Sequence, residues 1–263
     1  MLNLHQRISK TSTKNRLSDN NTQNQKTNDI NLQKTSFYIK DYGLDGLVKV
    51  CYTVISGPYD RLKEPRVVTP GWKYICFTDQ KFTSDVWEIR PLPKEIVEDS
   101  TLTQVKRQRI MKIQPYLFFE YDISVWVDGN LTIIGNLDEF VKENYADLSI
   151  TAHPARNRIY DEARAIVRCR KDTQKNIDIQ VDLYKKEKFP QHYGLNETNV
   201  IIRRNTEDVR KVMDMWAEVL RKYSHRDQMS FNYVLWKLGM KNLLLSFDVK
   251  VRNKYFKLSG HRR

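Results

Sequence analysis

The sequence has no long apolar run, no apolar stretch at its amino terminus and no pattern of paired cysteines. No apolar run approaches the ~18 residues of a membrane span, and the amino terminus lacks the apolar stretch of a signal peptide. The three cysteines, Cys51, Cys76 and Cys169, have spacings that fit neither a zinc site nor a disulfide framework. Cys51 and Cys76 stand in apolar, strand-like runs, which favours buried reduced thiols. These absences argue against secretion and membrane spanning, and they predict a cytoplasmic protein in a reducing compartment.

Acidic residues are too few to balance the basic ones. The 45 Lys and Arg against 32 Asp and Glu give a formal net charge of +13. Residues 1–36 hold six Lys or Arg and two Asp (+4), and residues 241–263 hold seven and one (+6), which leaves +3 for residues 37–240. The basic ends could contact the cytoplasmic face of a membrane or another acidic partner. The nearly neutral body makes nucleic acid an unexpected partner.

The chain reads as a polar extension followed by one folded domain. Residues 1–36 are rich in Asn, Thr, Gln, Ser and Lys, so we expect them to be flexible and the domain to span residues 37–263. Apolar and β-branched runs predict strands at residues 47–55, 72–78, 85–89, 123–127, 148–152 and 199–202. Helical patterns alternate with them at residues 101–113, 137–145, 157–187, 208–223 and 226–238. This alternation predicts an α/β fold with a mostly parallel central sheet flanked by helices. Ligands of such sheets bind beyond the carboxyl ends of the strands.

One predicted buried strand leads directly into Asp128, Gly129 and Asn130. The strand delivers an acid, the glycine allows close approach of the backbone, and Asn130 adds a second oxygen-bearing side chain. Mg²⁺ and Mn²⁺ prefer such ligands and commonly bridge a carboxylate to substrate phosphates. The segment therefore indicates a metal and phosphate site, although a plain strand-to-turn Asp-Gly has the same pattern.

Basic residues precede that strand on a predicted helix. Arg109 and Lys112 are three residues apart, so they share a helix face and could approach one diphosphate together. The alternative is a solvated basic face without a ligand.

Further polar residues follow other predicted strands. His153 and Arg156 come after one strand, Glu162 lies on the helix beyond it, and Glu197 stands at the mouth of the last strand. These residues could line a polar pocket or simply lie at the surface.

The segment His225, Arg226, Asp227 and Gln228 opens a predicted amphipathic helix. With Asn232 five residues after Asp227, it matches the catalytic-loop spacing of protein kinases. A kinase also needs a Gly-rich phosphate loop and a D-F-G motif, which are absent, and only 31 residues follow Asn232. The kinase interpretation is therefore excluded, and Asp227 is either a plain helix cap or a site residue.

Taken in order, these segments resemble the DUF616 group of glycosyltransferases, which includes plant proteins implicated in cell-wall glycan synthesis. The resemblance spans about residues 48–232 and implies the GT-A fold of nucleotide-sugar glycosyltransferases. It rests on Tyr52-Thr53-x5-Tyr59-Asp60-x-Leu62, Trp72-Lys73-Tyr74-Ile75-Cys76-Phe77-Thr78-Asp79, Lys112-x-x-Pro115, Trp126-Val127-Asp128-Gly129-Asn130, His153-Pro154-x-Arg156-x3-Tyr160-x-Glu162, Gly194-Leu195-x-Glu197 and His225-Arg226-Asp227-Gln228.

The chain is more distantly similar to family 8 glycosyltransferases. In that family an Arg on the helix before the metal motif contacts the donor, and the matching residue here is Arg109. The family's metal motif is D-x-D, in which Asn130 replaces the second acid here. A D-Q-x-x-x-N segment, which begins here at Asp227, faces the sugar. A histidine near the carboxyl end ligates the metal, and His261 is the candidate.

The resemblance implies a metal-dependent hexosyl- or pentosyltransferase that moves a sugar from a nucleotide-sugar donor, expected to be UDP-linked, to a hydroxyl of a glycan or glycoconjugate. A Mn²⁺ or Mg²⁺ ion, with Asp128, Asn130 and His261 as candidate ligands, would neutralise the departing diphosphate. Asp227 and Gln228 are the expected catalytic residues. Asp227 would be the general base of an inverting enzyme, and either residue would support an oxocarbenium-like centre in a retaining one.

The same resemblance assigns two groups of binding residues. The expected donor site consists of Thr53, Tyr59, Asp79, Arg109, Lys112, Asp128, Gly129 and Asn130. The expected sugar or acceptor pocket consists of His153, Arg156, Glu162, Glu197, His225 and Arg226.

Two other classes of protein remain open. A basic nucleic-acid-binding α/β protein would bind in a salt-sensitive way and ignore nucleotide sugars. A catalytically silent interaction protein that keeps the fold would show no turnover, and Asn130 in place of an acid is its best support.

Overall fold

The computed structural model describes residues 43–247 and 253–260. The chain separates into two compact units, Met1–Gly43 and Leu44–Arg263, and all the described residues but Gly43 belong to the second. The predicted flexible extension at residues 1–36, the expected start of the domain at residue 37 and His261 lie outside the described residues.

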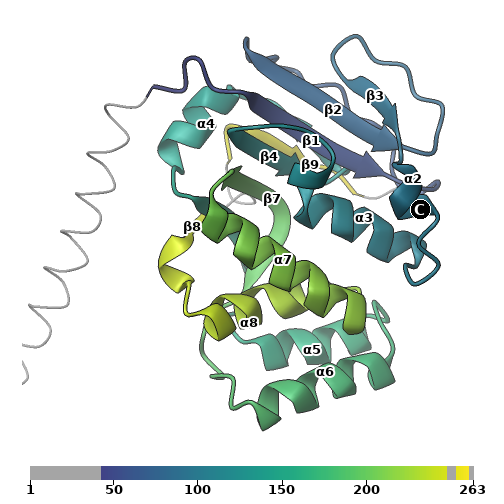
Figure 1. Cartoon of the computed structure of the whole chain (residues 1–263), viewed down its shortest axis with the longest axis vertical. Coiled ribbons are helices and arrows are strands. Elements are labelled where there is room, and N and C mark those ends of the chain that lie inside the picture. Colours follow the sequence, from purple (N-terminus) through teal and green to yellow (C-terminus); the bar gives the residue numbers. More distant parts are fainter. Residues whose placement is uncertain (1–42, 248–252, 261–263) are drawn as a thin grey trace, which may run out of the picture. The chain divides into compact units, whose positions relative to one another are not determined.

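A seven-stranded sheet forms the centre of the second unit, in the order β3-β2-β1-β4-β7-β6-β8 (Figure 1). Its strands are β1 (Lys49–Ile55), β2 (Trp72–Thr78), β3 (Glu88–Pro91), β4 (Ile123–Val127), β6 (Leu148–Ala152), β7 (Asn196–Arg204) and β8 (Leu244–Phe247). Four of the six neighbouring pairs are parallel, and β7 is antiparallel to both β4 and β6. The predicted α/β fold with a mostly parallel sheet flanked by helices is confirmed.

The central strands follow from their composition. Every residue of β1 and of β4 is buried, as expected of apolar, β-branched strands covered on both faces. Strands β2, β4 and β6 have the predicted bounds. Cys51 in β1 and Cys76 in β2 are buried free thiols, as predicted.

The edge strand β3 differs from the strand predicted at residues 85–89. It begins at Glu88 and includes Pro91, which the sequence pattern places after the strand. Because β3 lies at the edge of the sheet, the missing N–H of Pro91 leaves no ladder hydrogen bond unmade.

Helices cover one face of the sheet. They are α3 (Gln104–Ile113), α5 (Ile159–Arg168), α6 (Gln174–Lys186), α7 (Glu207–Lys222) and α8 (Gln228–Leu238), with α5 and α6 stacked beyond α8 (Figure 1). Their apolar residues form one core cluster with the strands, which includes Trp126, Trp216 and Phe231. This layer positions the carboxyl end of α3 and the amino end of α8 beside the carboxyl end of β4.

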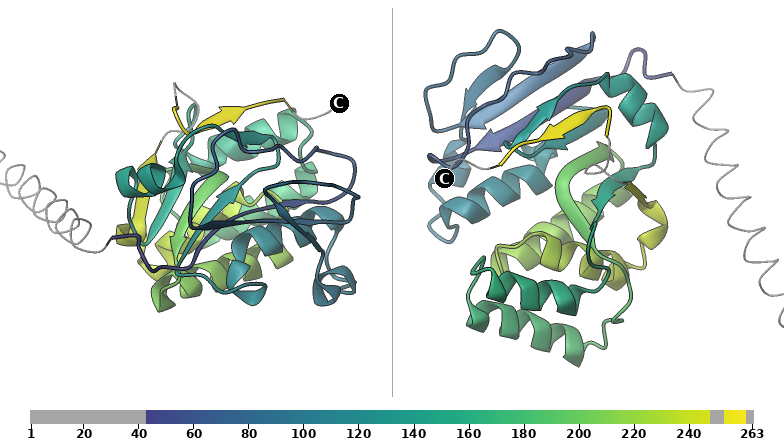
Figure 2. Two further views of the ribbon diagram at one scale, coloured as in Figure 1. Left: turned by 90° about the horizontal axis from the view of Figure 1, so that it is seen from above. Right: turned by 180° about the vertical axis from the view of Figure 1, so that it is seen from behind.

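The opposite face has a thinner cover. Here α4 (Leu137–Glu143) packs with a two-stranded sheet of β5 (Leu131–Ile133) and β9 (Phe256–Leu258). Figure 2 shows β9 and α7 on opposite sides of the central sheet. Beyond β9, the backbone N–H of Ser259 donates to the carbonyl of Asn130 at 2.9 Å. The segment that follows β9 therefore lies beside the Asp128–Asn130 turn.

The helix predicted at residues 157–187 is two helices. Arg170, between α5 and α6, has a φ of 52°, which a right-handed helix does not accommodate. A new helix then starts after Thr173, whose side chain accepts a hydrogen bond from the backbone N–H of Asn176. Apolar residues occur with helical spacing on both helices, so the pattern alone does not reveal the break.

Several short elements have no counterpart in the sequence prediction. They are α2 (Lys94–Val97), β5, β8 and β9, with three or four residues each. Elements of this length are too short for an apolar period to be visible.

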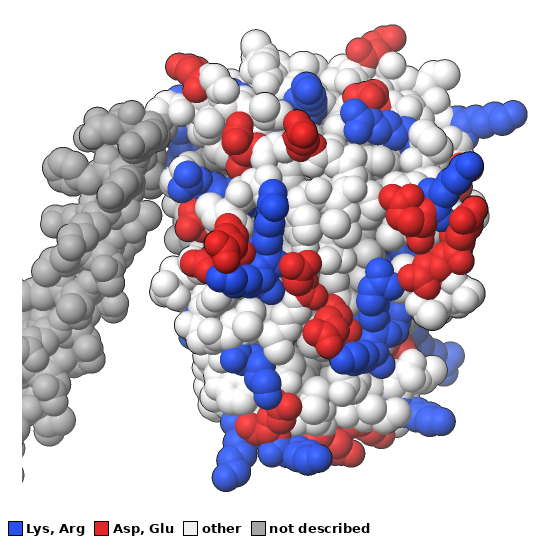
Figure 3. Space-filling model, viewed as in Figure 1, with Lys and Arg blue, Asp and Glu red and all other residues white. Residues whose placement is uncertain are grey.

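The surface shows mixed charge. On the described part of the face in Figure 3, basic and acidic side chains are interleaved, and no large area carries one sign. No helix in the described part of the chain is long and apolar enough to cross a membrane.

Candidate functional site

Four side chains from four elements meet at the carboxyl end of β4. Lys112, near the end of α3, is fully buried, and its Nζ lies 2.8 Å from Oδ2 of Asp227, 2.9 Å from Oγ1 of Thr198 and 3.3 Å from Oδ1 of Asp128. The Thr198 hydroxyl donates to the same Asp227 oxygen at 2.8 Å. Asp128 directly follows β4, Thr198 lies in β7 and Asp227 is the N-cap of α8. The structure thus brings the predicted Lys112, Asp128 and Asp227 together.

The antiparallel direction of β7 explains the presence of Thr198. Since β7 runs opposite to β4, its first residues lie at the edge where β4 ends. The backbone N–H of Asp128 donates to the carbonyl of Asn199 at 2.9 Å, which continues the pairing of the two strands. The amino end of β7 therefore contributes side chains to the same site as Asp128.

A buried arginine holds the end of α3 in place. The carbonyl of Lys112 accepts from the Tyr52 hydroxyl at 2.6 Å and from Nη2 of Arg203 at 2.7 Å. Nη1 of Arg203 donates to the Tyr52 hydroxyl at 2.8 Å. A cation at a helix carboxyl terminus is favoured by the helix dipole. Arg203 and Tyr52 together set the position from which the Lys112 side chain reaches the carboxylates.

Arg109 adds a second cation one helical turn earlier. Its Nη1 lies 3.9 Å from Oδ1 of Asp128, and its Nε lies 3.7 Å from Oδ2 of Asp227. Burial by itself raises the pKa of Asp227, but Arg109 and Lys112 outweigh burial and hold that pKa well below its usual range. Asp128 also accepts from Nε1 of Trp126 at 2.8 Å. The cluster therefore pairs two carboxylates with two cations.

Two adjoining cavities open beside this cluster. The first, of about 480 Å³, lies between the loop at residues 56–59, α3 and the residues 170–171 and 225–226. The second, of about 240 Å³, is lined by residues that include Asp128, Asn130, Glu197, Asp227 and Gln228. Residues shared by both linings are Tyr59, Arg109, Lys171 and Arg226. The shared residues mark the junction of the two cavities.

The predicted donor residues after β1 and β2 take different positions. Tyr59 lines both cavities. Asp79 supports the wall of the first cavity, because its carboxylate accepts from the backbone N–H of Gly57 at 2.9 Å and from Ser56 Oγ at 3.0 Å. Thr53 is buried within β1, two residues before the strand ends, and lines neither of these cavities.

Gly129 lies where the turn after β4 comes close to the end of β1 and the loop that follows β1. A Cβ placed there would lie 3.1 Å from Cγ1 of Ile55 and 3.4 Å from the Asp60 side chain. The backbone at Gly129 therefore does approach other atoms closely, as the sequence predicts. The atoms that it approaches belong to the Ile55 and Asp60 side chains.

A second polar cluster lies behind the second cavity. Glu162, buried in α5, accepts from Nε2 of Gln228 and, at 2.5 Å, from Nε of Arg156. Nε2 of His153 lies 3.4 Å from Oε2 of Glu162 and 3.9 Å from Oε1 of Glu197. Burial raises the pKa of Glu162, but hydrogen bonds from His153 and Arg156 lower it more, so the net pKa is below its usual value. Glu197 and Gln228 line the second cavity. Glu162 contacts Gln228 and His153 contacts Glu197, while Arg156 in turn bonds to Glu162 and His153.

The residues before α8 line the junction and the first cavity. Nδ1 of His225 lies 3.3 Å from Oδ2 of Asp172, and burial lowers the pKa of His225 more than Asp172 raises it. Arg226 lines both cavities, and its Nη2 donates to Oε1 of Gln228 at 3.3 Å.

Asn232, for which the family 8 likeness implies a contact with the sugar, joins β7 to α8. It is buried and exchanges two hydrogen bonds with Asn196, at 3.1 and 3.0 Å, so that it holds the start of β7 against α8. It lines neither of these two cavities, and its contact with the sugar stays a prediction.

Oxygen ligands for a metal are present at the end of β4. Asp128 and Asn130 both line the second cavity, and Mg²⁺ or Mn²⁺ binds through one or two such groups together with substrate phosphates. Among the residues that the structure describes, no group of three or more His, Cys, Asp or Glu could hold a metal ion. The donor set therefore fits a cation that takes part of its ligands from a bound phosphate.

Sequence reasoning missed five residues of the site. They are Trp126, Arg170, Lys171, Thr198 and Arg203. Arg203 had a visible signal, since it ends an apolar run that reads as a buried strand. Arg170 and Lys171 had none, because the pattern places them inside one long helix.

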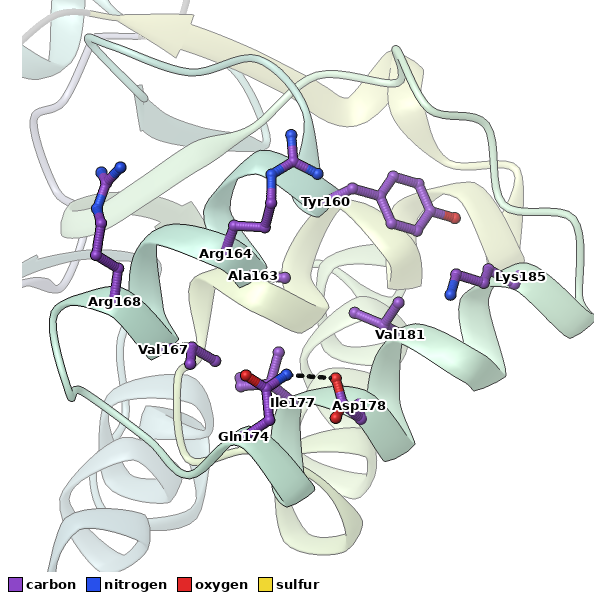
Figure 4. Close-up of a pocket in the computed structure, with 10 residues that line it drawn as sticks. All are labelled: Tyr160, Ala163, Arg164, Val167, Arg168, Gln174, Ile177, Asp178, Val181 and Lys185. Atoms are coloured by element: carbon purple, nitrogen blue, oxygen red, sulfur yellow. Dashed lines mark hydrogen bonds between the residues drawn. The ribbon is translucent and has the colours of Figure 1, made fainter.

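A third cavity lies between α5 and α6 and contains none of the predicted site residues. It has a volume of about 390 Å³. Figure 4 shows Ala163 and Val167 of α5 near Ile177 and Val181 of α6, with Arg164 and Arg168 extending from α5. This cavity is separate from the cluster around Lys112.

Comparison with known proteins agrees with the motifs. The model of the TOD1/MUCI70 glycosyltransferase-like domain matches residues 77–261. The probable hexosyltransferase MUCI70 of Arabidopsis thaliana is 28% identical over 153 residues, which cover 53% of this chain and 26% of that protein. The chain thus spans about a quarter of the length of this relative. It belongs to the TOD1/MUCI70 family of glycosyltransferase-like domains, which confirms the resemblance to the DUF616 glycosyltransferases.

Proposed function

We propose that this chain is a GT-A-type glycosyltransferase that moves a hexosyl group from a UDP-linked donor to a hydroxyl of a glycan or glycoconjugate. The observation that carries the proposal is a pair of adjoining cavities joined at Arg109, beside the carboxylates of Asp128 and Asp227, which the buried Lys112 holds in place. Membership of a glycosyltransferase-like family and the name of the Arabidopsis relative support glycosyl transfer. A mostly parallel sheet with the site at the carboxyl end of β4 supports the GT-A assignment.

The two cavities suit the two parts of such a donor. The first cavity has the size and the polar lining for a nucleotide, with Tyr59, Gln104 and Gln108 in its walls. The second cavity, lined by carboxylates and amides, suits the hydroxyl groups of a sugar. The diphosphate would then lie at their junction, beside Arg109.

A divalent cation would be held by Asp128 and Asn130, with His261 as a further candidate ligand. It would supply Lewis-acid neutralisation of the diphosphate. Support for His261 comes from Ser259, two residues earlier, whose backbone N–H donates to the carbonyl of Asn130.

Asp227 is better suited to positioning than to proton transfer. Its depressed pKa makes it a weak base near neutral pH, and its Oδ2 is occupied by Lys112 and Thr198. Asp227 pairs with Arg109, which lines both cavities, and would aim this cation at the place where negative charge develops on the departing diphosphate. The buried Lys112 fixes Asp227 in that position. This role does not depend on whether the enzyme inverts or retains.

Glu197 and Gln228 are the proposed contacts of the donor sugar and the acceptor hydroxyl. Both line the second cavity, and both are held from behind by the cluster of Glu162, His153 and Arg156. The cluster would fix the orientation of these two side chains.

UDP release from a panel of UDP-hexoses, with Mn²⁺ and with simple glycan acceptors, tests the proposal. Asp128→Ala should lower kcat/KM about 100-fold or more, because it removes a cation ligand and an ionic partner of Lys112. Asp178→Ala, the same change in the separate α5–α6 cavity, should leave kcat/KM at the wild-type value. Equal activity of wild type and Asp128→Ala would contradict the assigned site. The absence of turnover with any UDP-, GDP- or dTDP-sugar would favour the catalytically silent interaction protein.

A further inference from the structure

We propose that the connection between α5 and α6 binds the diphosphate of the donor through Arg170 and Lys171. This inference rests on the proposed function and deepens it. Arg170 and Lys171 line the first cavity, and Lys171 also lines the second, so it stands at the junction. The first cavity is lined by four basic side chains (Arg109, Arg170, Lys171 and Arg226) and by no Asp or Glu. A cavity of this composition selects an anion.

Arg170 and Lys171 differ from Arg109 in the pairing of their charges. Arg109 is already paired with Asp128 and Asp227. Within the described ranges, neither Arg170 nor Lys171 forms an ion pair, and both are exposed. The neighbouring acid Asp172 is engaged by the Ser224 hydroxyl and lies 3.3 Å from His225. A bound diphosphate can therefore recruit Arg170 and Lys171 without breaking an existing ion pair. Arg226 also forms no ion pair in the described part of the chain, but its guanidinium already donates to Gln228.

The backbone of this connection is fixed at both ends. At the end of α5 the N–H of Arg170 donates to Val167, and that of Lys171 donates to Ile166, each at 2.9 Å. These two bonds form a Schellman motif. On the other side, Thr173 caps α6. The contacts of Asp172 with Ser224 and His225 tie the connection to the loop before Asp227. The two cations are thus carried on a backbone whose position is set before any ligand arrives.

Arg170 occupies the left-handed position of the motif, where glycine is favoured, with a φ of 52°. Lys188 has the same role at the end of α6, with a φ of 61° and hydrogen bonds from its own N–H to Lys185 and from Phe189 to Tyr184. Lys188 lines neither cavity, so positive φ alone does not mark the site. Replacing Arg170 or Lys188 by glycine therefore gives two variants with the same expected effect on the fold. Their expected effects on UDP binding differ.

The test measures thermal unfolding and UDP affinity, in the presence of Mn²⁺, for Arg170→Gly and Lys188→Gly. Both variants should raise Tm by about 2–4 °C, because glycine adopts this conformation without strain. Only Arg170→Gly should weaken UDP binding, by about tenfold or more, since it removes a charged hydrogen-bond donor from the diphosphate. Lys171→Met, which keeps the length of the side chain and removes its charge, should weaken UDP binding to a similar extent.

A ligand series identifies which part of the nucleotide is bound. The loss of affinity in Arg170→Gly and Lys171→Met should be large for UDP, smaller for UMP and absent for uridine. If wild type and both variants bind UDP equally, the inference is overturned while the proposed function stands. The same holds if uridine loses as much affinity as UDP. If the wild type binds neither UDP nor any UDP-sugar, the proposed function fails and this inference fails with it.

Discussion

Lys112 is the residue around which the proposed site is organised. A fully buried ammonium group is stable only when carboxylates and hydrogen-bond acceptors replace its water. Asp227, Thr198 and Asp128 provide that replacement within 3.3 Å. The carbonyl of the same residue is fixed by Tyr52 and Arg203. The cluster thus holds its charges in place without a ligand, which is the condition for electrostatic stabilisation of a leaving group.

The depressed pKa of Asp227 predicts a specific dependence of stability on pH. Since the folded-state pKa lies below the unfolded-state value of about 4, the stabilisation is present above pH 4 and is lost as the pH falls toward the folded-state value. Asp227→Asn should lower the free energy of unfolding at pH 7 by about 3 kcal/mol, because Lys112 and Arg109 lose a buried partner. Between pH 5 and pH 3, the free energy of unfolding of Asp227→Asn should also fall less than that of the wild type.

Urea unfolding at pH values from 7 to 3 measures both effects. Asp178→Asn, at an exposed position on α6 where the carboxylate accepts only from the neutral Gln174 side chain, is the matched control and should keep the wild-type profile. An Asp227→Asn profile parallel to that of the wild type would show that this carboxylate is not stabilised by its neighbours.

At this scale the sequence predicts the charged residues of the cluster better than their hydrogen-bond partners. Arg109, Lys112 and Asp128 could be identified because helical spacing and a strand end mark them. The contacts of Lys112 with Thr198 and Arg203 join residues 86 and 91 positions apart, and no local pattern contains that information. Arg170 and Lys171 escape notice for another reason, since their place depends on a helix break that the apolar period conceals.

At the scale of elements, the direction of β7 decides what the site contains. In a wholly parallel sheet the first residues of β7 would lie at the opposite edge from Asp128. Because β7 is antiparallel to β4, Glu197 and Thr198 lie at the site edge instead. The sequence shows a strand here but not its direction, because strand direction depends on the connections and not on the strand's own residues.

The pairing of β5 with β9 also shapes the site. Gly135 follows β5, and a Cβ at this position would lie 2.5 Å from the carbonyl oxygen of Lys254 and 2.9 Å from Cα of Tyr255. The backbone N–H of Ile134 donates to the carbonyl of Tyr255 at 2.7 Å. There is consequently no room for a side chain at Gly135 unless the β9 segment moves.

Gly135→Ala should therefore loosen β9 and the segment that reaches Asn130. We expect a loss of about 1–3 kcal/mol in the free energy of unfolding from overpacking. Hydrogen exchange of the β9 amides should become faster, and UDP should bind more weakly in the presence of Mn²⁺. Gly260→Ala is the control for stability, because a Cβ there meets nothing within 4 Å. Wild-type exchange rates in β9 of Gly135→Ala would contradict the proposed link between β9 and the site.

At the scale of the whole described unit, charge separates the candidate functions. On the described part of the face in Figure 3, the two signs are interleaved, as on an ordinary surface, and a broad basic stripe for nucleic acid is not present there. Basic side chains are instead concentrated in the first cavity, which contains no acid. This distribution supports a small anionic ligand over a nucleic acid.

Thermal unfolding of the wild type and Asp128→Ala with UDP, GDP and dTDP, each with and without Mn²⁺, decides whether Asp128 belongs to a nucleotide site. A ligand at about 100 times its Kd adds roughly 2.7 kcal/mol, which should raise Tm by about 5 °C or more. We expect UDP to raise the Tm of the wild type only with Mn²⁺ and to leave the Tm of Asp128→Ala unchanged. An equal rise in both proteins, or no rise with any nucleotide while nucleic acid binds at low salt, would contradict the assigned nucleotide site.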